Sequence, residues 1–210
     1  MIMLKYLDYV TNEISKIEPT LVEELNIYKN MYIKYEKSSL LSPIYKGTAE
    51  LFNMHNFLLP TDENISISWD IDLIYKKYAK SSTTQYLSLT DFNTYFDNDL
   101  KNSKDEFDRV YSEVNSIHSH TYNDILTILF KPLHCNLILD GRHRYTEFKK
   151  FKPEQPINIS YFNSNDIIDC IISASDLVKY IILNNIDELN DYILGKGNLQ
   201  YVINFEKCGL

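Results

Sequence analysis

The chain contains few cysteines, few glycines and prolines, and no long apolar run. Its three cysteines, Cys135, Cys170 and Cys208, are odd in number and share no close spacing, which argues against a disulfide framework and a cysteine-based zinc site. No stretch approaches the ~18 uninterrupted apolar residues of a membrane span, and the first eight residues lack a signal-peptide pattern. We therefore expect a cytoplasmic protein with reduced thiols and no membrane contact.

Positive charge is also scarce. The chain has 21 Lys and Arg against 29 Asp and Glu, for a formal charge of −8. Non-specific DNA binding depends on many basic side chains that neutralise phosphates, so DNA is not the expected partner. Residues 131–152 are the exception, because they hold six Lys or Arg and two acids, a local charge of +4. A small basic patch in an acidic chain suits a compact anion.

The composition is that of a folded domain. Apolar residues make up 44% and charged residues 24% of the chain, which is enough for a packed core of one compact domain with an appended helical part. We expect an N-terminal helical segment over residues 1–60 and an α+β core over residues 61–165. C-terminal helices and a last strand over residues 199–205 should complete the chain, in a segment spanning residues 166–210.

Periodicity places the elements. Apolar residues at three- and four-residue spacing indicate two helices over residues 3–37, with Pro19 opening the second. Residues 38–62 look irregular, and strict alternation over residues 64–69 predicts a half-buried strand. Further helices are expected at residues 89–100, 103–116 (opened by a capping box from Ser103 to Glu106), 142–151 and 164–194, the last with breaks near 173–175 and 184–185. Strands are expected at residues 125–130, 135–139 and 156–162, which gives a small mixed sheet.

The most informative segment follows the strand at residues 135–139. Asp140 and Gly141 end that strand, and Arg142, His143 and Arg144 follow at the start of a helix. A strand, a glycine turn and a helix start place backbone N–H groups and positive charge around a phosphate or another anion. The alternative is an exposed basic helix end without a ligand. Cations oppose the dipole at a helix N-terminus unless an anion lies among them, which favours the anion site.

The same segment carries a family resemblance. The string Leu-Ile-Leu-Asp-Gly-Arg-His-Arg-Tyr-Thr at residues 137–146, between two predicted strands, resembles the ParB/sulfiredoxin-like fold. Members of that superfamily share the order strand, turn, strand ending in D-G-x-H-R, helix, strand, and the free-serine kinases look most similar. The resemblance covers residues 120–165, with residues 65–69 as a candidate first strand of the sheet. It does not extend to residues 1–60 or 165–210.

The resemblance implies nucleotide binding. Gly141 would let the backbone approach the phosphates of ATP or ADP, and Arg142, His143 and Arg144 would contact them. Asp140 would contact Mg²⁺ or orient the group that accepts the phosphoryl. The bidentate geometry of an arginine–phosphate pair would make Arg144 hard to replace by lysine.

This chain departs from the family pattern at several positions, which limits the family activities that we expect of it. Sulfiredoxins have their reactive cysteine directly after the glycine, where this chain has Arg142, so sulfiredoxin activity is not expected. The arginine-rich box and helix-turn-helix of chromosome-partitioning ParB proteins are not evident. The free-serine kinases use a glutamate soon after the first strand. Here Asp70 and Asp72 are the candidate substitutes, since a carboxylate there could deprotonate a hydroxyl.

Other polar groups have plainer interpretations. His118 and His120, with Asp124 or His134, could supply metal ligands, but an isolated H-x-H in a loop is more often solvated. An acidic cluster is expected to form a solvated helix face rather than a cation site; it comprises Asp97, Asp99, Asp105, Glu106 and Asp108.

Three functions are consistent with the sequence. The first is an enzyme that transfers a phosphoryl group from ATP or ADP to a small hydroxyl-bearing substrate, a free amino acid being one candidate. The second is a non-catalytic nucleotide-sensing module whose helical flanks bind a protein partner or a second copy. The third is a ParB-like DNA-binding protein or nuclease, which would bind DNA in a salt-dependent way.

Overall fold

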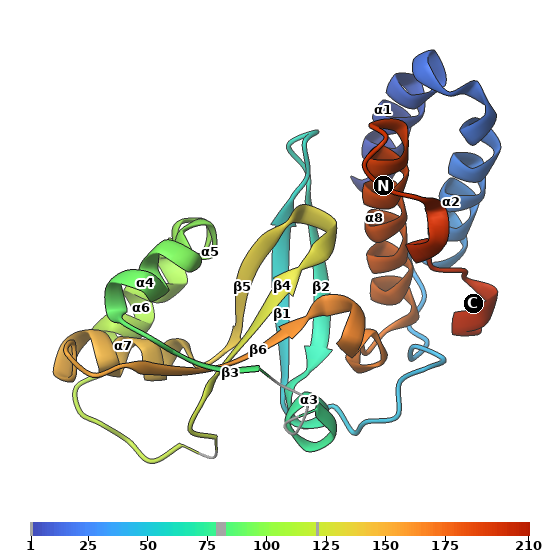
Figure 1. The fold of residues 1–210 in the computed structure, drawn as a ribbon. Coiled ribbons are helices and arrows are strands. Elements are labelled where there is room, and N and C mark those ends of the chain that lie inside the picture. The colour runs from blue at the N-terminus through green and yellow to red at the C-terminus, as the bar shows by residue number, and fades with distance from the viewer. Residues whose placement is uncertain (1, 79–82, 121) are drawn as a thin grey trace. The chain divides into compact units, whose positions relative to one another are not determined.

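The computed structural model describes residues 2–78, 83–120 and 122–210 and shows a mixed α+β architecture (Figure 1). The chain divides into two compact units. Unit 1 comprises Met1–Leu73 and Ile168–Leu210, and unit 2 comprises Ile74–Ile167. The two chain ends, which the sequence analysis treated as separate segments, therefore belong to one unit. None of the described helices is long and apolar enough to cross a membrane.

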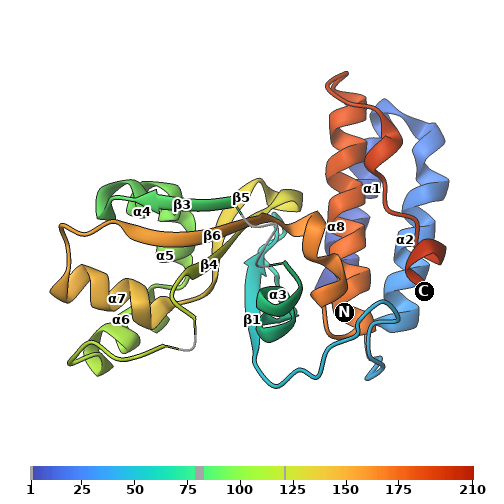
Figure 2. The same ribbon diagram turned by 60° about the horizontal axis from the view of Figure 1, so that its bottom comes forward.

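Unit 1 is built on three helices that lie side by side in both ribbon views (Figures 1 and 2). They are α1 (Ile2–Ile17), α2 (Val22–Tyr35) and α8 (Ala174–Ile193). Pro19 starts the short 3₁₀ turn η1 (Pro19–Leu21) between the first two helices, close to the predicted break. Ser173 caps α8 by accepting a hydrogen bond from the backbone N–H of Asp176 at 3.0 Å, and this confirms the predicted break near residue 173.

The predicted break at Asn184 and Asn185 is wrong, because α8 runs through both residues. The side chain of Asn185 instead makes hydrogen bonds to the backbone of the C-terminal segment. Its Oδ1 accepts from the N–H of Ile203 at 2.7 Å, and its Nδ2 donates to the carbonyl of Ile203 at 2.9 Å. The predicted last strand over residues 199–205 is also wrong, since this segment begins with the 3₁₀ turn η4 (Leu199–Tyr201) and continues irregularly to the next 3₁₀ turn, η5 (Glu206–Cys208). A side-chain amide supplies the hydrogen bonds that a partner strand would have given.

Asn185→Ala is expected to release this C-terminal segment and to lower the free energy of unfolding by about 1–2 kcal/mol, the worth of two partly buried hydrogen bonds. Urea unfolding measures the loss, and hydrogen exchange at the amide of Ile203 locates it. Asn190→Ala, at an exposed position of the same helix, is the control. Equal losses in the two variants would contradict the assigned role of Asn185.

A two-stranded sheet completes unit 1. β1 (Phe52–Leu58) pairs antiparallel with β2 (Asn64–Asp70). β2 confirms the predicted strand, with Ile65, Ile67 and Trp69 buried on one face. We call the segment from Asp140 to Arg144 the basic turn. β2 was expected as the first strand of the sheet that carries this turn, and that prediction is wrong, because β2 pairs with β1 in a separate two-stranded sheet. β1 itself lies in the stretch that looked irregular in the sequence.

Unit 2 contains a four-stranded sheet in the order β3-β6-β4-β5. β4 (Ile125–Phe130) and β5 (Cys135–Asp140) form an antiparallel hairpin through the turn η2 (Lys131–Leu133), and β6 (Ile157–Asn163) runs parallel to β4. These three strands confirm the sequence prediction. The edge strand β3 (Thr83–Leu87) pairs antiparallel with β6 and was not predicted, because its short, mostly polar sequence shows no apolar alternation.

Helices of unit 2 pack against this sheet (Figure 2). The predicted helix over residues 89–100 is broken at Phe96 into α4 (Leu89–Tyr95) and α5 (Asp97–Asn102), and α6 (Lys104–Glu113) follows. α7 (Arg142–Phe151) has the predicted bounds. The chain also forms α3 (Ile71–Tyr78) before β3 and the 3₁₀ segment η3 (Ser164–Cys170) after β6. One core cluster joins the helices to the strands: Phe92, Phe96, Phe107 and Tyr145 meet Ile125, Ile138, Ile157 and Ile159.

Two sequence predictions are wrong in this region: the side-chain cap at Ser103 and the solvent exposure of Asp99. Ser103 precedes α6 without capping it by a side-chain hydrogen bond within the described part of the chain, and its hydroxyl lies 3.5 Å from the carboxylate of Asp99 instead. Asp99 was expected on a solvated face, yet it is 1% exposed and accepts a hydrogen bond from the N–H of Ile138 at 2.9 Å. Ile138 lies on the edge strand β5, so Asp99 satisfies a backbone donor there.

Candidate anion site at the start of α7

The turn from β5 into α7 has the backbone that the sequence predicts. Gly141 adopts φ +107°, and a Cβ at this position would lie 3.1 Å from the Arg144 side chain and from the Cα of Ile125. The positive φ therefore favours glycine, and a Cβ would fit only if its neighbours moved by a few tenths of an ångström. Among the described residues, no side chain caps α7, which leaves its first-turn N–H groups available to an anion.

Arg144, expected to contact phosphate, is directed into the protein. Its side chain is 6% exposed. One terminal nitrogen pairs with Oδ2 of Asp140 and also lies 3.4 Å from the hydroxyl of Tyr75, while the other donates to the carbonyl of Tyr122. In this structure Arg144 therefore serves the protein's own acceptors.

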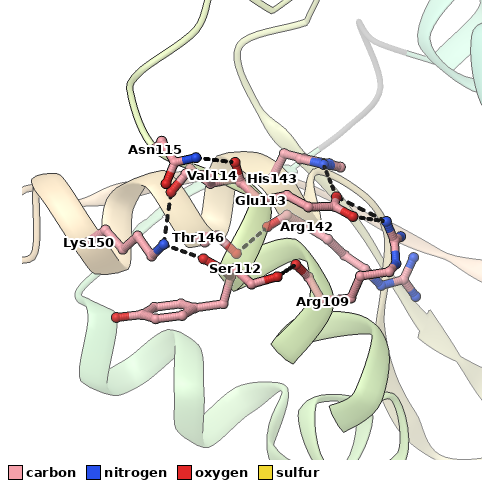
Figure 3. Close-up of polar contacts among 10 residues, drawn as sticks. Arg109, Ser112, Glu113, Val114, Asn115, Arg142, His143, Thr146 and Lys150 are labelled. Atoms are coloured by element: carbon pink, nitrogen blue, oxygen red, sulfur yellow. Dashed lines mark hydrogen bonds and ion pairs between the residues drawn. The ribbon is translucent and has the colours of Figure 1, made fainter.

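The side chains of Arg142 and His143, unlike that of Arg144, are directed toward α6 (Figure 3). The Arg142 side chain is 9% exposed and lies over the ring of Phe107, with 5.6 Å between the guanidinium carbon and the ring centre. Its Nε is 3.6 Å from a Glu106 oxygen, and this buried atom makes no hydrogen bond to any described residue. The His143 side chain is 56% exposed, with Nε2 3.9 Å from Oε2 of Glu113.

Further along α7, Glu147 contacts His118 and His120, the two histidines predicted as candidate metal ligands. Its carboxylate accepts from the backbone N–H of His118 at 3.1 Å and lies 3.0 Å from Nε2 of His120. Glu147 itself is buried. The described ranges hold no group of three or more His, Cys, Asp or Glu placed to bind a metal ion.

A second polar cluster lies beside the basic turn, at the start of β4. Both carboxylate oxygens of Asp124 accept hydrogen bonds from β6, one from Asn158 and one from Ser160, the latter at 2.8 Å. The hydroxyl of Tyr75 donates to the carbonyl of Asp124 at 3.0 Å and lies 3.4 Å from Oδ2 of Asp140. Burial raises the pKa of Tyr75, which keeps this hydroxyl protonated and able to donate.

From the sequence, Asp124 was predicted only as a candidate metal ligand, without its partners Asn158 and Ser160. Asn158 and Ser160 occupy alternate positions of β6, so they point to the same face of the sheet. This alternation within an otherwise apolar strand was the available signal. The partner from β4 could not be read from it, because strand pairing is a long-range property.

Asp70 and Asp72 lie in unit 1. Asp70 is 1% exposed, and its carboxylate accepts from the hydroxyl of Tyr45 at 2.6 Å and from the backbone N–H groups of Ala49 and Leu73 at 3.0 and 2.8 Å. These bonds hold the start of α3 against the loop that precedes β1. Asp72 lies in the first turn of α3, where a negative charge is favoured by the helix dipole.

No protein-family model matches the chain, and the searches of curated proteins and of solved structures also returned no match.

Proposed function

We propose that the start of α7 binds the phosphate groups of a nucleotide. The observation that carries the proposal is the buried Nε of Arg142, which makes no hydrogen bond within the described chain and lies at a helix start without a side-chain cap. The Glu106 oxygen nearest to this Nε is 3.6 Å away and half exposed, too far for a hydrogen bond. A phosphate oxygen within hydrogen-bond distance would supply the missing acceptor, and a buried polar group without a hydrogen bond costs about 1–3 kcal/mol. His143 is exposed beside it and adds a second contact.

The reaction we propose is phosphoryl transfer from ATP or ADP to a small hydroxyl-bearing substrate. The bond between the terminal phosphorus and its bridging oxygen breaks, a bond to the substrate oxygen forms, and the substrate proton passes to a carboxylate. This chemistry depends mainly on positioning and charge neutralisation. Asp124 is the carboxylate that we propose for the proton, because Asn158 and Ser160 hold it in place beside the basic turn. A free amino acid such as serine is the acceptor suggested by the resemblance.

A resident Mg²⁺ at Asp140 fits these residues poorly. Oδ2 of Asp140 faces the Arg144 guanidinium, which competes with any cation. Asp140 and Asp124 together supply only two carboxylates, fewer than a magnesium site made of protein groups alone requires. Mg²⁺ commonly binds through one or two carboxylates together with substrate phosphates and water. Such an ion would arrive with the nucleotide.

A specific observation also favours the second candidate, a nucleotide-sensing module without chemistry. Asp70 and Asp140, two of the carboxylates that the sequence suggested for catalysis, are engaged by the protein's own donors, and so is Asp124. Turnover separates the two functions. An enzyme consumes ATP or ADP in the presence of a hydroxyl-bearing acceptor, whereas a sensor binds the nucleotide unchanged.

His143→Ala is expected to weaken nucleotide binding about tenfold, because it removes one charge-assisted contact worth roughly 1.5–3 kcal/mol at most. A thermal-shift series with ATP, ADP, CTP, GTP and pyrophosphate, each with and without Mg²⁺, measures this. Ligands that bind the native state raise its melting temperature. Lys149→Ala removes an exposed cation from the same helix and is the control.

A shift for wild type that is retained in Lys149→Ala and reduced in His143→Ala supports the site. The proposal fails if wild type shifts with none of the five ligands, or if His143→Ala binds as wild type does.

A further inference from the structure

One face of α6 presents charged groups to the start of α7. Glu106, Arg109 and Glu113 are spaced by three and four residues along α6, so they lie on the same side of the helix. Glu113 lies between two basic groups (Figure 3). Its carboxylate accepts from Nη1 of Arg109 at 2.8 and 3.0 Å, and Oε2 lies 3.9 Å from Nε2 of His143. A carboxylate thus occupies a position that two basic side chains flank.

The contacts of Glu113 are weak ones. The side chains of Arg109, Glu113 and His143 are each about half exposed, and an exposed ion pair at i,i+4 contributes only about 0.3–0.5 kcal/mol. The distance to His143 exceeds that of a hydrogen bond. Glu113 is also the last residue of α6, where the helix dipole disfavours a negative charge. A doubly charged phosphate can therefore displace this carboxylate.

The surroundings of Glu113 stay in place when the carboxylate leaves. Nζ of Lys150 donates to the carbonyls of Tyr111 and Val114 at the end of α6. This contact joins the end of α6 to α7 through groups that do not involve the Glu113 side chain. The ends of the two helices that carry Arg109 and His143 are therefore held together without the Glu113 side chain.

We propose that Arg109 is a further phosphate-binding residue and that Glu113 holds the anion position in the ligand-free protein. This inference rests on the proposed function, because it concerns the same nucleotide-phosphate site. Arg109, Arg142 and His143 then surround one phosphate group, two from α7 and one from α6. Glu113 acts as a competing anion, so ligand affinity is lower than the three basic groups alone would give.

The test uses the whole 210-residue chain with pyrophosphate and ATP as probes, and titration calorimetry as the readout. Glu113→Gln is expected to tighten binding about fivefold, because both the competing ion pair with Arg109 and the repulsion between the carboxylate and the phosphate are lost. Arg109→Ala should weaken binding by a similar factor. Glu154→Gln, an exposed acid beyond the end of α7, changes the net charge equally and should alter affinity less than twofold.

The outcomes separate the two proposals. If His143→Ala weakens binding but Glu113→Gln matches Glu154→Gln, or Arg109→Ala binds as wild type, the role of α6 is wrong and the nucleotide site stands. If neither wild type nor Glu113→Gln binds either probe, both proposals fall. Circular dichroism on each variant confirms that the fold is unchanged.

Discussion

Arg144→Ala is expected to lower the free energy of unfolding by about 2–4 kcal/mol. Removing one partner of a buried ion pair typically costs about 3–5 kcal/mol, and we reduce this value because the Asp140 side chain is one-third exposed. The substitution also leaves the carbonyl of Tyr122 without its guanidinium donor. The loss should therefore exceed that of any exposed basic residue in the chain.

Urea unfolding measures this loss, and Arg109→Ala is the matched control. Arg109 makes an exposed i,i+4 pair with Glu113, so its removal should cost no more than about 0.5 kcal/mol. Arg144→Lys should recover part of the stability, because an ammonium can pair with Asp140 but lacks the planar fork that also reaches Tyr122. Equal stability of Arg144→Ala and Arg109→Ala would show that the buried pair contributes nothing.

This expectation changes how the nucleotide site is tested. A loss of binding in Arg144→Ala would not identify a phosphate contact, because the same variant loses packing around the turn. His143, which is exposed and lies on the first turn of the same helix, is the appropriate residue to substitute.

Asp99→Ala is expected to cost about 2 kcal/mol. The carboxylate accepts the N–H of Ile138 on the edge strand β5, and a buried donor without an acceptor costs about 1–3 kcal/mol. Asp99→Asn should lose less, since the amide oxygen can still accept. The loss should be accompanied by faster hydrogen exchange at Ile138, because α5 would no longer hold that strand.

Asp97→Ala provides the control for this prediction. Asp97 is an aspartate of the same helix, and it makes an exposed pair with Lys101 at 2.6 Å. Its substitution should change the free energy of unfolding by about 0.5 kcal/mol or less. If the two aspartate variants unfold alike, Asp99 has no structural role at β5.

Local sequence was sufficient for much of the fold around the site. Gly141 predicted the turn because few other residues adopt a positive φ. The hairpin of β4 and β5 and the bounds of α7 also followed from apolar runs and neighbouring turn residues. In each case the signal and the structure lie within a few residues of one another.

Long-range contacts account for the predictions that were wrong. Asn185 looked like a helix breaker, yet its amide binds Ile203 and α8 continues through it. Asp99 looked solvated, yet Ile138, 39 residues later, buries it against a strand edge. Neither partner is visible from the local pattern of charge and hydropathy.

The candidate site shows the same division. The amino-acid order was enough to place three basic residues at a helix start, because strand, glycine turn and helix are local features. Their directions were not predictable: Arg144 faces Asp140, while Arg142 and His143 face Glu106 and Glu113 of α6. A side chain's direction depends on which charges and apolar surfaces the packed neighbours supply, and those neighbours come from distant parts of the chain.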